Sequence, residues 1–257
     1  MFNITPIPIL ETNYIWLLHD GREAVAVDPG EAAPLLRYLA AHQLKLAAVL
    51  ITHHHGDHTG GLAELVEQAP CPVYGPGHIA HVSQAVADGQ QISILGQSLR
   101  VIAVPGHTLD HVAYYATADV ADTGALFCGD TLFAAGCGRL FEGTPAQMFQ
   151  SLQTLAHLPE DTRVFCTHEY TLDNLRFALA AEPGNAALHA RYAQAQATRA
   201  AGLPTVPSTI WLENQTNPFL RSHADGIRES ALARNPQATD PVSIFATLRS
   251  WKDHFKA

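Results

Sequence analysis

The chain contains 257 residues, of which 47% are hydrophobic and only 15% are charged. A chain of this length and apolar content buries a substantial core, which excludes a disordered protein. Its formal net charge of -9 and its lack of a dense basic run argue against nucleic acid as a partner. Lys and Arg must neutralise the phosphates of a bound strand. Any anionic ligand must therefore meet local positive groups.

The N-terminal segment and the cysteines predict a cytoplasmic protein. Residues Met1 to Leu18 lack a basic start and are interrupted by prolines, so they do not resemble a secretory signal. No stretch reaches the roughly 18 to 20 apolar residues that a membrane helix requires, so we expect no membrane partner. The cysteines lack CxxC pairing, and we interpret them as reduced, small buried residues. They are Cys71, Cys128, Cys137 and Cys166.

Short β-branched or aromatic runs predict a series of strands in the first two thirds of the chain. These strands are expected at residues 13–18, 24–27, 48–52, 99–104, 112–117, 125–128 and 164–167. Helical patterns lie between some of them, at residues 32–42, 60–68 and 145–157. The helix at residues 145–157 should begin with Thr144 as its N-cap, followed by Pro145. The mixture indicates an α/β fold.

The pattern changes after His168. Residues 172–181 and 187–201 are Ala-rich and favour helices, and a Pro-containing connection leads to a last predicted helix at residues 241–255. We therefore predict a domain boundary near residue 170, with one domain over residues 1–169 and a helical one over residues 170–257.

Polar residues of interest come directly after five of the predicted strands. They are Asp28, His53, His107, Asp130 and His168. Because loops at strand ends often carry functional side chains, we expect several of these loops to converge on one site.

The strongest single signal is the run Thr-His-His-His-Gly-Asp-His-Thr-Gly-Gly, which begins at Thr52. His53, His55, Asp57 and His58 offer three imidazoles and one carboxylate within six residues. Zinc, iron and manganese all accept this mixed nitrogen and oxygen set. A turn, rather than a regular helix or strand, should let the side chains point in the different directions that two ions need.

The run resembles the metal-binding motif of the metallo-β-lactamase superfamily, as do three later segments. These segments are Pro-Gly-His107-Thr, Gly129-Asp130-Thr and Thr167-His168-Glu169-Tyr170. The resemblance covers residues 1 to 168 and implies an αβ/βα sandwich, followed by a C-terminal all-helical domain.

A narrower resemblance points to the glyoxalase II, or hydroxyacylglutathione hydrolase, family. It rests on the segments Asp130 to Arg139, Glu142-Gly143-Thr144, His168 to Thr171, Glu182-Pro183-Gly184-Asn185 and Asn217 to Arg221. These run nearly to the C-terminus, as the helical substrate-binding domain of that family does. The resemblance implies hydrolysis of S-(R)-lactoylglutathione to glutathione and D-lactate, a step in methylglyoxal detoxification.

The resemblance also implies two divalent metal ions per chain, with zinc as the first choice and iron or manganese as alternatives. One ion would be held by His53, His55 and His107, and the other by Asp57, His58 and His168, with Asp130 bridging both. Asp57 and Asp130 would be catalytic through a metal-bound hydroxide. Asp28 is expected either to orient a ligating histidine or to cap a turn before Pro29.

Contacts to the glutathione moiety are implied for five residues. They are Arg139, Phe141, Tyr170, Arg249 and Lys252. Where some members of the family carry Lys and Tyr, this chain has Arg139 and Phe141, so one phenolic hydrogen bond is missing. In the last predicted helix, apolar residues at i, i+4, i+7 and i+11 form a stripe, and Arg249 and Lys252 lie along one of its edges.

Thioester hydrolysis at neutral pH needs a better nucleophile than free water. Binding to a metal lowers the pKa of water from about 15.7 to about 7, and a metal ion also stabilises the oxyanion. A serine or cysteine nucleophile is disfavoured, because the chain has no Gly-x-Ser-x-Gly elbow and Cys137 has no activating histidine close in sequence.

Three other functions remain open from the residues. A glutathione persulfide dioxygenase with a single iron carries a similar His-rich motif, and another hydrolase of the same fold would share the metal centre. A non-catalytic metal-binding module would keep the ligands without turnover, although structural zinc sites usually close with four protein ligands. We expect a monomer that acts on a small glutathione thioester.

Overall fold

The computed structural model describes residues 3–118 and 123–256. The chain divides into two compact units, and the described residues of each are considered separately below. The first unit comprises Met1–Val104 and Asp110–Gly129, and the second comprises Pro105–Leu109 and Asp130–Ala257. The second unit thus includes the short loop that carries His107. This division differs from the boundary near residue 170 that the sequence suggests.

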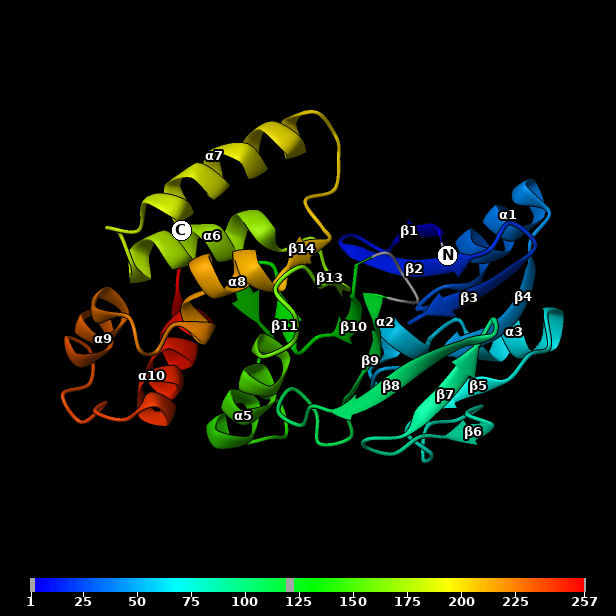
Figure 1. Ribbon diagram of the computed structural model, residues 1–257, viewed down its shortest axis with the longest axis horizontal. Coiled ribbons are helices and arrows are strands. Elements are labelled where there is room, and N and C mark those ends of the chain that lie inside the picture. The colour runs from blue at the N-terminus through cyan, green and yellow to red at the C-terminus, as the bar shows by residue number, and fades with distance from the viewer. Residues whose placement is uncertain (1–2, 119–122, 257) are drawn as a thin grey trace. The chain divides into compact units, whose positions relative to one another are not determined.

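The first unit opens with a six-stranded sheet whose strands follow chain order (Figure 1). Its strands are β1 (Asn3–Ile9), β2 (Asn13–His19), β3 (Glu23–Val27), β4 (Lys45–Leu50), β5 (Val73–Gly75) and β6 (Gln84–Ala85). The pairs β1–β2 and β2–β3 are antiparallel, whereas β3 to β6 run parallel. Parallel neighbours need crossovers, and the helices α1 (Ala32–His42) and α3 (Leu62–Gln68) lie in those from β3 to β4 and from β4 to β5. The single-turn helix α2 (Gly56–Thr59) lies just before α3.

One hydrophobic cluster joins this sheet to its helices. Leu35 and Leu39 of α1, together with Leu62 of α3, pack with Leu17 and Val49 of the sheet. All five side chains are at most 5% exposed. This core fixes β3 and β4, and therefore the chain that leaves each of them at its C-terminal end.

An antiparallel run of four strands completes the first unit. It contains β7 (Gln91–Ile94), β8 (Gln97–Ala103), β9 (Val112–Ala116) and β10 (Ala125–Gly129). Every residue of β9 and β10 is buried. The hydroxyl of Tyr114 in β9 donates a hydrogen bond to the carbonyl of Ile51 at 2.8 Å. Strand β9 is thereby tied to the segment that leads from β4 into the His-rich run.

The second unit contains two short strand pairs and most of the helices. The strands are β11 (Leu132–Phe133), β12 (Gly136–Cys137), β13 (Arg163–Cys166) and β14 (Ser208–Thr209). The helices are α5 (Pro145–Ala156), α6 (Thr171–Ala181), α7 (Ala186–Ala200), α8 (Ile210–Thr216), η1 (Pro218–Leu220), α9 (Asp225–Leu232) and α10 (Pro241–His254). Helices α6 and α7 run alongside each other (Figure 1) and share an apolar cluster around Leu175 and Leu188.

Capping residues account for the best-predicted helix boundaries. Thr144 accepts a hydrogen bond from the backbone N–H of Gln147, whose side chain accepts one from the backbone N–H of Thr144 in return. This capping box and Pro145 start α5 where the sequence predicts. Asp240 and Pro241 start α10 in the same way. No helix in the described ranges is long and apolar enough to cross a membrane.

Every predicted helix except that at residues 32–42 differs from the observed one by one or two residues at one or both ends. The helix that the sequence predicts from Gly60 begins at Leu62, and α2 occupies part of the His-rich run, where the sequence predicts a turn instead of a regular helix. The reason is local, because the backbone N–H groups of His58 and Thr59 both donate to the carbonyl of His55 and close a helical turn. The last helix ends at His254, one residue before Phe255.

Candidate metal centre

Asp28 organises the start of the His-rich run. It follows β3 in a left-handed backbone conformation, with φ of 51°, and its side chain is buried. Its carboxylate accepts hydrogen bonds from the backbone N–H of Thr52 at 2.8 Å and from the Thr52 hydroxyl at 2.7 Å. The same carboxylate lies 3.0 Å from Nδ1 of His58. Asp28 therefore orients the His58 ring and directs its Nε2 away from the carboxylate.

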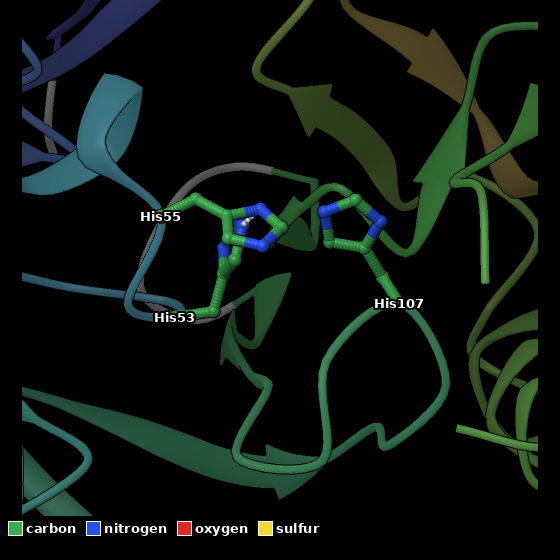
Figure 2. A group of neighbouring side chains, drawn as sticks. All are labelled: His53, His55 and His107. Atoms are coloured by element: carbon green, nitrogen blue, oxygen red, sulfur yellow. Dashed lines mark hydrogen bonds between the residues drawn. The ribbon is translucent and has the colours of Figure 1, made fainter. Parts of the chain in front are cut away.

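The imidazoles of His53 and His55 lie together after β4. Nδ1 of the fully buried His53 lies 3.0 Å from the Thr52 hydroxyl, and its Nε2 lies 3.1 Å from Nδ1 of His55. Figure 2 shows the rings of His53 and His55 close together on the segment that follows β4. On its other side, the His53 ring stacks on the buried His111 ring, with centroids 4.5 Å apart and planes 16° apart. Packing thus fixes the orientation of the His53 ring.

Asp57 is the carboxylate of the run and comes from the first turn of α2. One of its oxygens, Oδ2, accepts a hydrogen bond from the Asn13 side-chain amide at 3.0 Å. The same oxygen lies 3.5 Å from Nε2 of His58. Asp57 and His58 therefore present an oxygen and a nitrogen to the same place in the first unit.

Glycines allow the loop after β3 to touch this turn. A Cβ at Gly30 would lie 2.0 Å from the Asp57 carbonyl oxygen, and one at Gly60 would lie 2.7 Å from the Gly30 carbonyl oxygen. A Cβ at Gly61 would lie 2.5 Å from the Pro29 carbonyl oxygen. Since real Cβ atoms do not approach this closely, both segments need glycine to pack with Asp57 in its place.

The second unit holds the other three predicted donors. His107 comes from the loop at Pro105–Leu109 (Figure 2), Asp130 follows β10, and His168 follows β13. All three are at most 7% exposed. The Asp130 oxygen Oδ2 lies 3.5 Å from Nε2 of His107 and 3.3 Å from Nε2 of His168. One carboxylate oxygen therefore faces both imidazoles.

Backbone contacts hold this second set of donors. Nδ1 of His107 donates to the Arg139 carbonyl oxygen at 2.8 Å, which leaves Nε2 facing Asp130. A Cβ at Gly138 would lie 1.9 Å from the Asp130 carbonyl oxygen. The segment of Gly138 and Arg139 therefore lies directly against the donors, and only glycine fits at the first of these positions.

Two aromatic rings flank the donors of the second unit. Tyr170, which is 37% exposed, stacks on His168 with centroids 4.5 Å apart and planes 4° apart. Phe141, which is 61% exposed, meets His107 edge-on at 5.3 Å. Both rings are predicted to contact the substrate, and each lies beside a predicted metal ligand.

The three predicted cationic contacts differ from one another in environment. The Arg249 guanidinium is buried and donates to the carbonyl oxygen of Cys137 at 2.8 Å and to Asp253 at 3.0 Å. Arg139 is exposed and pairs with the same Asp253 oxygen at 3.3 Å. Lys252 donates to the Asp173 carbonyl oxygen at 3.1 Å. Burial, reinforced by the charge of Arg249, lowers the pKa of Lys252 to about 8.

All four cysteines are free thiols, as expected, and three of them are buried. Burial raises the pKa of Cys71 to about 11 and that of Cys166 to about 12. Burial also raises the pKa of Cys137, and the nearby Arg249 only partly offsets this effect. The raised pKa values of Cys71, Cys137 and Cys166 argue against a nucleophilic thiolate at these three positions.

Several residues that support the donors are not predicted from the sequence. Asn13 holds Asp57, His111 stacks on His53, and the Thr52 hydroxyl lies between Asp28 and His53. His111 carries a usable signal, because it follows His107 by four residues and directly precedes β9. The other two are ordinary polar residues, and nothing in their sequence context distinguishes them.

Two protein families match the chain, one after the other. The metallo-beta-lactamase superfamily matches residues 10–168, and the family described as hydroxyacylglutathione hydrolase C-terminus matches residues 169–255. A hydroxyacylglutathione hydrolase from Cupriavidus taiwanensis is 52% identical over 268 residues, covering 100% of both proteins.

Solved structures also resemble this chain. The BLEG-1 B3 metallo-β-lactamase superposes with a TM-score of 0.63 and 25% identity, covering 86% of this chain and 100% of that one. TTHA1623 in a di-iron-bound form gives a TM-score of 0.60 and 26% identity, covering 85% of this chain and 100% of that one. The predicted fold class, a metallo-β-lactamase fold followed by a helical region, is confirmed.

Proposed function

Because the chain belongs to the hydroxyacylglutathione hydrolases of the metallo-β-lactamase superfamily, we propose that it converts S-(R)-lactoylglutathione and water to glutathione and D-lactate. The chain is an enzyme, a thioester hydrolase of that family. The observation that carries the proposal is full-length identity of about half to a hydroxyacylglutathione hydrolase, combined with pairs of His and Asp donors in each unit. This reaction is part of methylglyoxal detoxification.

The donor geometry within each unit fits divalent metal ions. Two ligands on one tetrahedral zinc ion, with bonds of about 2.0 Å, lie about 3.3 Å apart. Nε2 of His53 lies 3.1 Å from Nδ1 of His55, and Oδ2 of Asp57 lies 3.5 Å from Nε2 of His58. In His53, His58 and His107, Nδ1 lies within hydrogen-bond distance of an oxygen atom of the protein. This contact leaves Nε2 as the ligand nitrogen of each ring.

We assign the seven donors to two ions. One ion is held by His53, His55 and His107, the other by Asp57, His58 and His168, and Asp130 bridges them. The position of one Asp130 oxygen beside both His107 and His168 supports the bridging role. Zinc is the first choice, although iron suits the same set of ligands and a structural relative is described as di-iron-bound.

Such ions, when bound, lower the pKa of a coordinated water and polarise a carbonyl. The protein side chains would hold the ions and orient the thioester next to them. Asp57 lies beside His58, and Asp130 lies beside His107 and His168, so each carboxylate would hold its ion next to the imidazoles of its own unit. Hydrolysis adds the water oxygen to the thioester carbon and breaks the carbon–sulfur bond, and the departing thiolate then takes up a proton. A thiolate leaves readily, so the site needs no strong general acid.

We further propose a catalytic domain over residues 1–169 and a helical substrate-binding domain over residues 170–257. The two family matches, which meet between residues 168 and 169, support this division. Arg139, Tyr170, Arg249 and Lys252 are assigned to the glutathione moiety, with Phe141 packing against it. Tyr170 and Phe141 already lie beside His168 and His107. The buried Arg249 contributes by holding the Cys137 carbonyl as well as by its charge.

A thioester assay with matched variants tests the proposal. The zinc-loaded wild type should release free thiol and D-lactate from S-lactoylglutathione, and should act much more slowly on a simple acyl thioester and on a β-lactam. Asp130→Ala should abolish this turnover, whereas Asp161→Ala, at an exposed turn, should leave it unchanged. Normal turnover by metal-replete Asp130→Ala would refute the assignment.

The same preparations separate the remaining alternatives. Oxygen uptake with glutathione persulfide, without thioester cleavage, would identify a dioxygenase. Faster β-lactam than thioester cleavage would identify another hydrolase of this fold, and tight metal binding without any turnover would identify a binding module. We also propose a cytoplasmic monomer, which is consistent with the free thiols. Fractionation and light scattering test these two points.

A further inference from the structure

A second group of metal-ligating side chains lies in the first unit, outside the seven donors assigned above. It consists of His54, His78 and Asp110, which come from three separate segments. His54 belongs to the His-rich run, His78 follows β5, and Asp110 precedes β9. We call this group the His54 cluster.

The distances within the His54 cluster match those of a metal site. Nδ1 of His54 lies 3.1 Å from both oxygens of Asp110. Nε2 of His78 lies 3.2 Å from Oδ2 of Asp110. These separations are close to the roughly 3.3 Å expected between two ligands of one tetrahedral ion. Both imidazoles thus direct a nitrogen toward a single carboxylate.

The His54 cluster is open to solvent on one side. Its side chains are 36% exposed at His54, 62% at His78 and 12% at Asp110. His54 and His78 also line a cavity of about 510 Å³, together with His81 and apolar residues such as Leu62. An ion bound here would keep water in its remaining positions, unlike a closed structural zinc site with four protein ligands.

We propose that the His54 cluster binds one divalent transition-metal ion, in addition to the metal centre of the reaction. Two imidazoles and one carboxylate form a ligand set that suits zinc, cobalt or nickel better than calcium or magnesium, which prefer oxygen. With three protein ligands and an exposed face, the site exchanges its ion with solvent more readily than the buried donors do. Because His54 lies between His53 and His55, an ion held there also restrains the backbone that positions those two ligands.

A metal titration of three proteins tests this site. The wild type, His78→Ala and His81→Ala are first loaded with zinc and passed through a desalting column, and Co²⁺ or Zn²⁺ binding is then followed by calorimetry. His78 is the residue to change because it is largely exposed, so its loss should not unfold the chain. His81 is the matched control, since it lines the same cavity but is not part of the cluster.

The wild type and His81→Ala should each bind one more equivalent than His78→Ala, or bind that equivalent at least about tenfold more tightly. Cobalt at this site should also give a visible absorption band that His78→Ala lacks. Identical titrations for all three proteins would overturn the proposal and leave the cluster as a set of hydrogen-bonded His–Asp pairs. Because the comparison is between variants, it is independent of whether the loaded protein cleaves thioesters.

Discussion

At the scale of single residues, the candidate centre depends on oxygen atoms that contact Nδ1 of the histidine rings, on the side opposite Nε2. Asp28 contacts Nδ1 of His58, and the Arg139 carbonyl contacts Nδ1 of His107. Such contacts select the tautomer and the ring orientation, so they influence metal affinity without touching the ion. Asp28 has a second contact, because its carboxylate also accepts two hydrogen bonds from Thr52 at the start of the His-rich run.

Replacing Asp28 tests this role of the supporting oxygens. Asn tolerates the left-handed backbone at this position, so Asp28→Asn should fold, but its amide removes one of the oxygens that accept hydrogen bonds. We expect zinc affinity to fall about 10- to 100-fold, measured by competition with a chromogenic chelator. Asp20→Asn, at an exposed turn with two backbone hydrogen bonds, is the control and should bind zinc normally. Equal affinities for the two variants would remove Asp28 from the centre.

The sequence predicts the donors better than it predicts their supports, and the reason is physical. The donors between His53 and His58 can be recognised from their residue types and spacing. Asn13, which contacts Asp57, lies 44 residues away in the sequence and has no such pattern. The partner of His107 is a backbone carbonyl, which every residue possesses. Only the folded chain shows which carbonyl is in reach.

At the scale of elements, α2 and the loop after β3 pack closely against each other. Gly30 and Gly60 bring backbone against backbone, and Asp57 lies at the point of contact. This close packing explains the glycines at positions 30, 60 and 61.

Two glycine substitutions test how much this contact stabilises the protein. Gly30→Ala places a methyl group 2.0 Å from the Asp57 carbonyl oxygen, so the free energy of unfolding should fall by about 1–3 kcal/mol. Gly56→Ala, in the same run, meets no atom within 4 Å and should change that free energy by at most about 0.5 kcal/mol. Denaturant unfolding of both variants gives the comparison. A stable Gly30→Ala protein would show that the loop shifts without cost.

Helix α10 leads to a prediction about pH, through Lys252. Burial lowers the pKa of this ammonium to about 8, so Lys252 loses its charge as the pH rises through that value. If the charge binds a glutathione carboxylate, KM should rise by up to roughly tenfold between pH 7 and pH 9. Lys252→Arg keeps its charge over this range and should show a flatter profile. Parallel profiles for wild type and Lys252→Arg would exclude Lys252 as the titrating contact.

The accuracy of the predicted elements follows the strength of their local signals. Helices α5 and α10 begin as predicted because Thr144-Pro145 and Asp240-Pro241 are caps that act within one turn. The sequence pattern does not predict β1, because Pro6 and Pro8 interrupt it. An edge strand such as β1 tolerates prolines that a central strand does not. The strands of two or three residues are formed by tertiary pairing and leave no periodic pattern to detect.

At the scale of the whole molecule, the proposed ligands are divided between the two compact units. The His-rich run belongs to the first unit, whereas His107, Asp130 and His168 belong to the second. If ions take ligands from both units, as proposed, the folded chain would bind them more tightly than the unfolded chain. Under the proposed assignment, metal binding therefore stabilises the fold as well as supplying the chemistry.

Removal of the metal should accordingly lower the thermal stability of the protein. At metal concentrations 100 to 1,000 times the dissociation constant, binding contributes about 2.7–4.1 kcal/mol, which for a chain of this size shifts Tm on the order of 10 °C. Calorimetry of the zinc-loaded and the chelated protein measures the difference, and restored zinc should reverse it. The control is the double variant Asp57→Ala and Asp130→Ala, whose Tm should respond little to the chelator. If the wild type responds as little as this variant, the seven residues do not hold the ions together.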